Sequence, residues 1–357
     1  MRPEMLRQER LRSHRLSAPA RSVAYAAQHM LAVQAQEFWA GRWALASRTA
    51  GTPTVSAVDG LFDRGVLVRA WTQRGTLHIV PAQDLAWMLQ VTGARQMRAQ
   101  EPRLRELGLD AEALKRVEHV VRTALRGGNA LTRAELFDLF VGIGIDPAGQ
   151  RGAHAIGALA LRGIICQGPT VARPGGVSRE QYFVLVDEHI GESASPVDPA
   201  AEMFARYIGG HGPATAADFA WWAGVTLTAA RAAASAAQND ERIHEVDDGL
   251  FAASNRPRRS PRAASVLALA SFEEYYISYA DRTVACPPEH LAAVGPGKNG
   301  MVRPIIVRDG VVIGTWRQST AIGRHAEDPI PELLTPGAAD AADIGAALDR
   351  YAAFITG

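Results

Sequence analysis

The sequence predicts an α+β protein of three tandem winged helix-turn-helix modules followed by a C-terminal β-rich, barrel-like domain. Three observations support this fold class. One pattern of helices followed by a strand–turn–strand repeats three times before residue 256, as in tandem winged helices. A basic, proline-rich stretch over residues 256–262 then has the composition of a linker. Beyond that stretch, the apolar pattern predicts mostly strands.

In the first copy, apolar residues at helical spacing predict a helix over residues 22–46. A capped helix follows over residues 54–63, with Thr54 at its start. Strands over residues 65–71 and 75–81 then form a hairpin.

The second copy begins with a helix that runs from Asp110 to the Gly127-Gly128 pair. Thr132 caps the next helix, and residues 151–162 form the third. Two strands follow, over residues 164–167 and 181–186. A long loop rich in Gly and Pro joins them.

The third copy has helices over residues 215–222 and 228–238 and short strands over residues 242–245 and 249–252. In the C-terminal region we expect a strand over 265–270, a hairpin of strands 301–308 and 311–317 turning at Asp309-Gly310, and a helix over 340–355. The predicted domains therefore span residues 1–105, 106–198, 199–255 and 262–357.

The bulk composition limits the class of protein. No run of eighteen or more uncharged apolar residues occurs, so no membrane span is expected. The basic N-terminus lacks the apolar centre of a signal peptide. Cys166 and Cys286 form neither a zinc pattern nor a disulfide framework, which favours the reduced cytoplasm, and no metal or cofactor is expected.

The charge is unevenly distributed. Residues 1–105 contain fifteen Arg and seven acidic residues, a balance of +8, although the whole chain has a net charge of +1. Such a basic third suggests a face for a phosphate backbone. A genome that favours Arg throughout is an alternative explanation for part of this excess.

The segment Gln34-Ala35-Gln36 is the strongest functional signal. Two neutral amides can orient a water or a base by hydrogen bonds, but they do not titrate. Because residues i and i+2 of a helix point to different sides, both amides can serve one site only where the helix ends or kinks. The alternatives are that they form a polar stripe on an apolar helix or are buried amides bonded to the backbone.

With this architecture, several motifs resemble one family, the AlkZ/YcaQ-type DNA glycosylases. They are Gln34-Ala35-Gln36, Arg74-Gly75-Thr76-Leu77-His78, Phe272-Glu273-Glu274-Tyr275-Tyr276 with Asp281-Arg282, Asn299 to Pro304, and Gly314 to Arg317. In that family a Gln–apolar–Gln motif marks the AlkZ-like branch. The resemblance implies a DNA glycosylase, with Gln34 and Gln36 catalytic, that excises bulky N7-alkylguanine lesions; some such enzymes protect antibiotic producers.

This chemistry suits the residues. An N7-alkylated guanine is cationic, so its glycosidic bond is already weakened and the enzyme needs only to position a water and tolerate an oxocarbenium-like sugar. A lyase step would need a desolvated Lys. The chain contains only Lys115 and Lys298, neither in a recognisable site, so we expect a monofunctional enzyme that leaves an abasic site. Glu37 is a further candidate base, although a solvated helix residue is the alternative.

The expected DNA contacts are basic groups on wings, linker and C-terminal hairpin: Arg74, His78, Arg258, Arg259, Arg303 and Arg317. Wing arginines commonly contact phosphates and thereby position the protein. His78 can instead cap its strand, and Arg303 and Arg317 can instead be solvated. The expected partner is double-stranded DNA with alkylated purines, bound by a monomer in the cytoplasm at the nucleoid.

Two other functions remain open from the sequence. One is a non-catalytic winged-helix regulator or damage sensor, and the other is a protein-interaction scaffold. A regulator is usually a dimer with two equivalent reading helices, whereas three unlike modules in one chain suit a monomer.

Overall fold

The computed structural model describes residues 1–255 and 266–357, and its described part mixes helix (47%) with strand (16%), which confirms the mixed helix-and-sheet class. The chain forms two compact units, each described separately below. The first unit comprises Met1–Val58, Arg173–Val177 and Ala200–Gly357. The second comprises Asp59–Ala172 and Ser178–Pro199.

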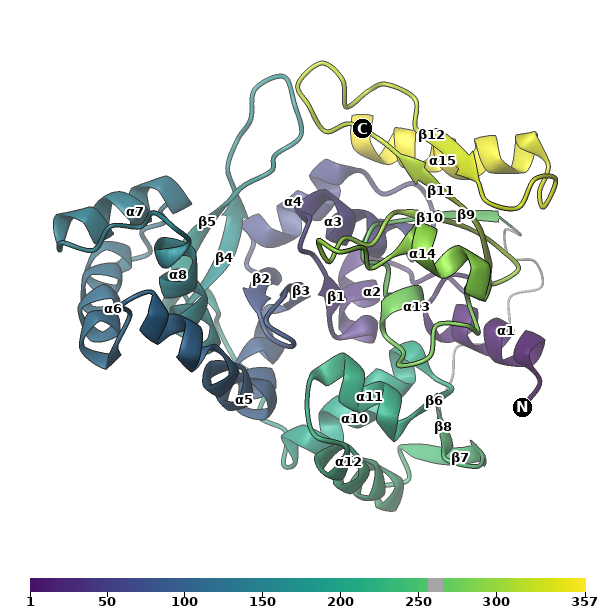
Figure 1. The fold of residues 1–357 in the computed structure, drawn as a ribbon, viewed down its shortest axis with the longest axis horizontal. Helices are drawn as coiled ribbons and strands as arrows, with labels where there is room; N and C mark the ends of the chain where they lie inside the picture. The colour runs from purple at the N-terminus through teal and green to yellow at the C-terminus, as the bar shows by residue number, and fades with distance from the viewer. Residues whose placement is uncertain (256–265) are drawn as a thin grey trace. The chain divides into compact units, whose positions relative to one another are not determined.

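The N-terminal part of the first unit is helical (Figure 1). Its elements are α1 (Pro3–Ser13), α2 (Val23–Met30), β1 (Val33–Gln34) and α3 (Phe38–Ser47), and α4 (Val55–Asp63) begins in this unit and continues into the second. Ser22 caps α2 by accepting a hydrogen bond from the Tyr25 backbone N–H, and Leu31 ends α2 with a φ of 64°. The prediction of one helix over residues 22–46 is therefore wrong: the helix breaks at Leu31, and the glutamine pair lies in the break.

A second group of elements in this unit follows residue 199. It consists of α10 (Pro199–His211), β6 (Ala214–Thr215), α11 (Ala216–Ala223), α12 (Leu227–Asn239), β7 (Ile243–Asp247) and β8 (Leu250–Ala253). Thr215 and Asp218 form a capping box that starts α11. The strands form a sheet in the order β6-β8-β7. The helices and strands predicted for the third copy are thus confirmed.

The C-terminal part forms an antiparallel sheet in the order β12-β11-β10-β9. Its strands are β9 (Val266–Leu269), β10 (Ile305–Arg308), β11 (Val311–Arg317) and β12 (Ile330–Leu333), with helices α13 (Glu274–Ile277), α14 (Leu291–Val294) and α15 (Ala341–Thr356). The predicted hairpin turns at Asp309-Gly310 as expected. Barrel closure is not confirmed, because across residues 266–357 β9 and β12 each pair on one side only and leave the sheet open.

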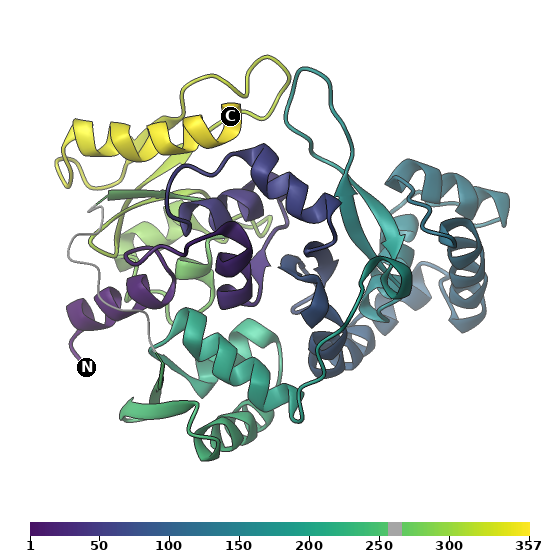
Figure 2. The ribbon, with the colours of Figure 1, turned by 180° about the vertical axis from the view of Figure 1, so that it is seen from behind.

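One core joins the two ends of the chain within this unit. Leu11 of α1 packs in the same buried cluster as Leu269 of β9 and Val307 of β10. The ring centroid of Tyr351 in α15 lies 5.4 Å from that of Trp43 in α3 and 4.7 Å from that of Trp316 in β11. Figure 2 shows α15, in yellow, beside the C-terminal strands. Helix α3, which directly follows the glutamine pair, is therefore held by C-terminal elements.

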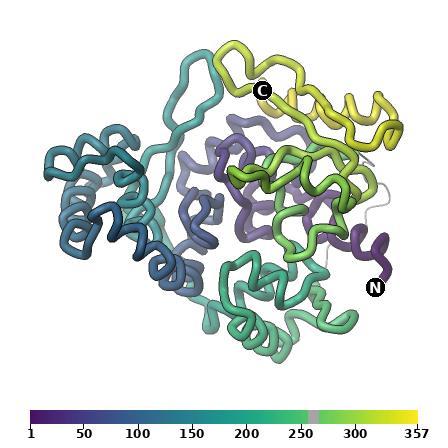
Figure 3. The backbone as a smooth tube through the Cα atoms, in the orientation of Figure 1, coloured from purple at the N-terminus to yellow at the C-terminus, as the bar shows by residue number. Residues whose placement is uncertain are grey.

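The second unit consists of a helical group and a sheet, and Figure 3 traces its chain from α5 through α6, α7 and α8 back to the sheet. Its elements are β2 (Leu67–Trp71), β3 (Leu77–Pro81), α5 (Leu85–Glu106), α6 (Ala111–Leu125), α7 (Arg133–Gly142), α8 (Arg151–Leu161), β4 (Ile165–Thr170), β5 (Gln181–Leu185) and α9 (Val186–His189). The strands lie in the order β3-β2-β4-β5. Asp110 caps α6, and Thr132 caps α7 as expected. The sequence pattern predicts no helix at the position of α5, which has 22 residues.

Three further expectations concern the whole chain. The count of three winged-helix modules and the four domain boundaries stay predictions. In the described residues, no helix is long and apolar enough to cross a membrane. The linker over residues 256–262, with Arg258 and Arg259, lies outside the described residues.

Candidate active site

The glutamine pair lies on the short connection between α2 and α3, in the first unit. Gln34 ends β1 and is 7% exposed, whereas Gln36 is exposed in the turn before α3. Leu31, with its left-handed φ of 64°, turns the chain out of α2 and so creates this connection. The requirement that the helix end or kink at the two amides is therefore met.

A buried carboxylate fixes the backbone of this segment. The Gln34 N–H donates to Glu274 Oε1 at 2.7 Å, across 240 residues of sequence. The other oxygen of Glu274 accepts from Trp222 Nε1 at 3.0 Å and from the Ser278 hydroxyl. Glu274 is fully buried, and a buried carboxylate is tolerated when donors surround it in this way. The site therefore rests on α13 as well as on β1.

His211 also lies against this carboxylate. Its Nε2 lies 3.3 Å from Glu274 Oε2, and its ring stacks on Tyr207 with 4.8 Å between ring centroids. Both residues lie on α10 and are fully buried. Helices α10, α11 and α13 thus converge on one carboxylate behind Gln34.

A buried ion pair lies beside Glu274. Glu273 Oε1 accepts from the Arg48 guanidinium, and both side chains are fully buried. Arg48 also donates to His14 Nδ1 at 3.3 Å, and His14 Nε2 lies 2.7 Å from the Tyr279 hydroxyl. Burial, together with the charges of His211, Arg48 and Arg10, holds the pKa of His14 well below its usual value, so this histidine is neutral.

Glu37 does not lie on a helix face exposed to solvent. It occupies the N-cap position of α3 and is half-buried. Its Oε2 accepts from the Ser271 hydroxyl at 2.6 Å and from Trp39 Nε1 at 3.1 Å. These bonds tie the turn after Gln36 to the segment that leads into α13, so the expected solvated surface residue is instead a structural contact.

The two predicted residues of the first wing lie in the second unit. Arg74 is in the β2–β3 turn with a left-handed φ of 55° and is half-buried. His78 lies on β3 and is fully buried, with Nδ1 3.1 Å from both the Thr72 hydroxyl and the Thr76 carbonyl oxygen. These contacts give His78 a local structural role within the β2–β3 hairpin, and its part in DNA binding stays a prediction.

The two predicted arginines of the C-terminal hairpin differ in their environment. Arg303, just before β10, forms an ion pair with Glu332 of β12 and lowers the pKa of that carboxyl group. Arg317 ends β11 and is exposed. Arg317 is therefore the better placed of the two for contact with a phosphate.

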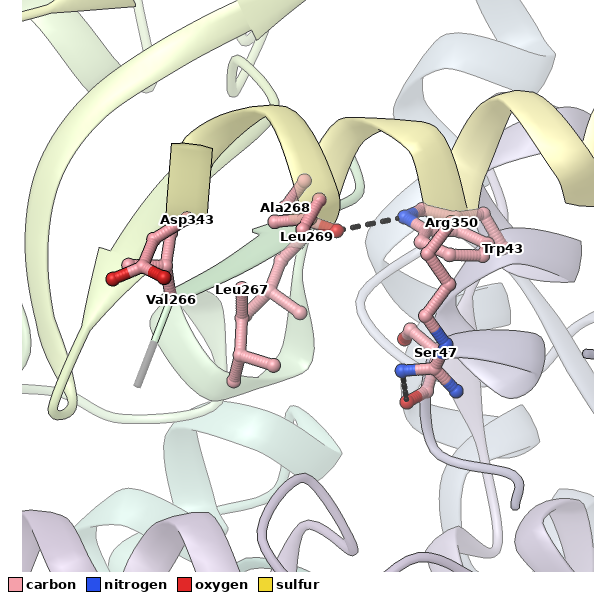
Figure 4. Close-up of a pocket in the computed structure, with 10 residues that line it drawn as sticks. Trp43, Ser47, Val266, Leu267, Ala268, Leu269, Asp343 and Arg350 are labelled. Atoms are coloured by element: carbon pink, nitrogen blue, oxygen red, sulfur yellow. Dashed lines mark hydrogen bonds between the residues drawn. The ribbon is translucent and has the colours of Figure 1, made fainter. Parts of the chain in front are cut away.

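A pocket of about 180 Å³ lies between α3, β9 and α15 (Figure 4). The Trp43 Nε1 donates to the Ala268 carbonyl at 2.9 Å, and the Arg350 guanidinium donates to the carbonyls of Ser47 and Thr49 at 3.1 and 2.7 Å. The Trp43 and Arg350 side chains that line the pocket are therefore already bonded to the backbone. None of the expected site residues lines this pocket.

Sequence reasoning missed the role of Glu274. In the sequence, Phe272-Glu273-Glu274 is only part of a motif, since nothing local distinguishes a buried carboxylate from a surface one. The weak signal available was the pair of adjacent acids within an otherwise apolar run, Ser271 to Ile277.

Comparison with known proteins identifies this protein as a DNA glycosylase. It belongs to the AlkZ-like DNA glycosylase family, whose model, described as DNA glycosylase AlkZ-like, matches residues 27–354. An interstrand DNA cross-link repair glycosylase of Streptomyces sahachiroi is 24% identical over 263 residues, which cover 70% of each chain. The solved structure of the Streptomyces sahachiroi DNA glycosylase AlkZ has the same fold, with a TM-score of 0.77 at 21% identity over 99% of this chain and 96% of that one. The family predicted from the sequence motifs is confirmed.

Proposed function

We propose that this protein hydrolyses the N-glycosidic bond of cationic N7-alkylguanine lesions, with Gln34 and Gln36 as the catalytic residues. The observation that supports this most directly is the geometry of the pair. The two amides lie on a turn whose backbone is held by the buried Glu274, and Gln36 is exposed to a substrate. A segment fixed in this way is preorganised for positioning a water.

The uncharged side chains suit a cationic base. The lesion already bears the positive charge that makes guanine a good leaving group, so no strong general acid is required. The amide carbonyls orient the attacking water at C1′, while the polar site tolerates the oxocarbenium-like sugar. Neutral, unmodified bases lack this activation and stay intact.

Bulky adducts and interstrand crosslinks are part of the proposed substrate range. The relative from Streptomyces sahachiroi is named as an interstrand DNA cross-link repair glycosylase, and it resembles this chain over 70% of its length. We extend that activity to this protein, and we propose that it serves self-resistance to a DNA-alkylating product.

The proposed reaction stops at the abasic site. A lyase step needs an amine with a lowered pKa, which burial usually provides. Lys115 is instead exposed and 3.9 Å from Glu112, and Lys298 is also exposed. Neither lysine has the desolvated environment of a Schiff-base nucleophile.

The proposed partner is double-stranded DNA, bound by a monomer in the cytoplasm at the nucleoid. Three winged-helix modules and a C-terminal region, with the predicted boundaries, would share this duplex. We assign phosphate contacts to Arg74, Arg258, Arg259, Arg303 and Arg317. We also propose His78 as a DNA contact, in addition to the hydrogen bonds that it makes within its hairpin.

The test is release of 7-methylguanine and of a bulkier N7 adduct from alkylated duplex DNA. We expect release by the natural protein and none by the Gln34→Ala/Gln36→Ala double variant. Gln28→Ala, an exposed glutamine on α2, is the matched control and should retain full activity. A crosslinked duplex, analysed on a denaturing gel, tests unhooking in the same series.

Trapping with borohydride tests the absence of a lyase step. A covalent protein–DNA adduct would contradict the monofunctional assignment. If the natural protein is folded and binds DNA but releases neither lesion, the catalytic proposal fails and a damage sensor on the same scaffold is the better assignment.

A further inference from the structure

A polar pocket of about 230 Å³ lies within the second unit, whereas the glutamine pair belongs to the first unit. Three arginines, two glutamines, one glutamate and one aromatic ring line it: Arg69, Arg133, Arg179, Gln167, Gln181, Glu180 and Phe183. They come from β2, the start of α7, β4, and the start of β5. None of the expected catalytic or DNA-binding residues is among them.

Two buried amides in this pocket each retain an unused hydrogen-bonding atom. Gln167 Oε1 accepts from Arg69 Nη1 at 2.7 Å, which leaves Gln167 Nε2 as a donor without a partner. Gln181 Nε2 donates to the Gly168 carbonyl at 2.6 Å, which leaves Gln181 Oε1 as an acceptor without a partner. The two residues are 3% and 1% exposed.

The orientation of both amides is fixed by the bonds that they do make. If the Gln167 amide were turned over, its nitrogen would face the Arg69 guanidinium. If the Gln181 amide were turned over, its oxygen would face the Gly168 carbonyl oxygen. Both arrangements are unfavourable. A buried polar atom without a partner costs roughly 1–3 kcal/mol. Two such atoms of opposite kind in one pocket therefore indicate a ligand that accepts at one point and donates at another.

The charges of the lining indicate the sign of that ligand. Three arginines and one glutamate give a formal charge of 3 − 1 = +2. The side chains of Arg133 and Arg179 are exposed, so they are able to turn toward a ligand, whereas Arg69 in β2 is buried and bonded to Gln167. Guanidinium groups bind phosphate oxygens through paired N–H donors.

We propose that this pocket binds a phosphate group that carries a proton. The phosphate oxygens accept from Gln167 Nε2 and from the arginines, and the P–OH group donates to Gln181 Oε1. Inorganic phosphate and the terminal phosphate of a DNA strand both have this chemistry near pH 6, since phosphomonoesters have a second pKa of about 6. Sulfate and an internal phosphodiester lack the proton. This inference does not depend on the proposed glycosylase reaction.

The experiment measures the thermal unfolding midpoint of the full chain at pH 6 during titration with inorganic phosphate or with sulfate at constant ionic strength, since a ligand of the folded state raises that midpoint. We expect at least tenfold tighter binding of phosphate than of sulfate. Gln181→Met removes the acceptor and should bring the two anions within twofold of each other. Arg179→Gln, on the surface, should weaken both, whereas Arg126→Gln, an exposed arginine of the same unit outside the pocket, should change neither.

Equal binding of phosphate and sulfate by the natural protein would overturn the proposal, as would a phosphate preference that persists in Gln181→Met. If Gln181→Met does not fold, the same decision rests on the anion preference of the natural protein and on Arg179→Gln against Arg126→Gln.

Competition with short duplexes separates the two sources. Displacement of phosphate by a 5′-phosphorylated duplex, but not by its 5′-hydroxyl counterpart, would assign the site to strand ends, and displacement by neither would assign it to free phosphate. Equal displacement by both duplexes would contradict the need for a proton.

Discussion

Gln34 and Gln36 share one motif but lie in different environments. Gln34 is 7% exposed on β1, and Gln36 is exposed in the turn that follows. Loss of a buried amide leaves its neighbours without partners, which costs roughly 1–3 kcal/mol, whereas loss of an exposed one usually costs under about 0.5 kcal/mol.

We predict that Gln34→Ala and Gln36→Ala each lower the single-turnover rate of lesion excision by more than about tenfold, or about 1.4 kcal/mol of barrier. Only Gln34→Ala should also lower the free energy of unfolding, measured with urea. DNA affinity should change little in either variant. Parallel losses of affinity and rate would show that the pair is structural.

The buried arginines show why charge counting along a sequence overstates a surface. Arg10, Arg42, Arg48 and Arg69 all belong to the basic N-terminal third, and all are buried. Arg48 neutralises Glu273, which lies 225 residues away from it in sequence. The excess of +8 is therefore partly internal, and no local pattern in the sequence separates such arginines from those of a DNA-binding face.

At the scale of elements, α13 supports the glutamine pair through Glu274. A carboxylate accepts on both oxygens, and here it receives the Gln34 N–H, Trp222 Nε1 and the Ser278 hydroxyl. An amide at this position has one accepting oxygen, and its NH2 group would face another donor.

We therefore predict that Glu274→Gln lowers the excision rate at saturating DNA by about tenfold or more, about 1.4 kcal/mol, while the dissociation constant for DNA stays within about threefold. Glu273→Gln is the matched control, because it weakens the adjacent buried ion pair but does not contact Gln34. It should lower stability yet leave the rate per folded molecule nearly unchanged. If both variants lose rate equally, Glu274 has no special link to the pair.

Elements with local signals were predictable from sequence. Thr132 with Glu135 and Thr215 with Asp218 form the capping boxes whose spacing is visible in the chain. The break after α2 was not predictable, because Leu31 adopts a left-handed φ that neither its residue type nor its neighbours signal. The long helix α5 likewise lies in a stretch whose polar residues obscure its apolar face.

At the scale of the molecule, two histidines link stability to pH. Burial lowers the pKa of His14 well below 6.5, and burial with the nearby charge of Arg15 lowers that of His29 to about 4. Between pH 6.5 and about 4 the unfolded chain binds protons at these positions that the folded chain does not. Stability therefore falls as the pH drops through this window, by up to about 1.4 kcal/mol per pH unit for each proton.

We predict that His29→Gln, which can still donate to the Ser13 carbonyl, reduces the loss of urea stability between pH 7 and pH 5. His119→Gln, at an exposed position, should leave that loss unchanged. Identical pH dependence in both variants and the natural protein would rule out a contribution from His29.

The bond between Gln34 and Glu274 joins positions 240 residues apart. During synthesis, the motif leaves the ribosome long before its anchor exists. A nascent chain therefore holds the two glutamines without the carboxylate that fixes the backbone of Gln34. If the pair is catalytic, as proposed, excision begins only once α13 has emerged and packed. An N-terminal fragment, however well it binds DNA, would then lack the anchor of the proposed site.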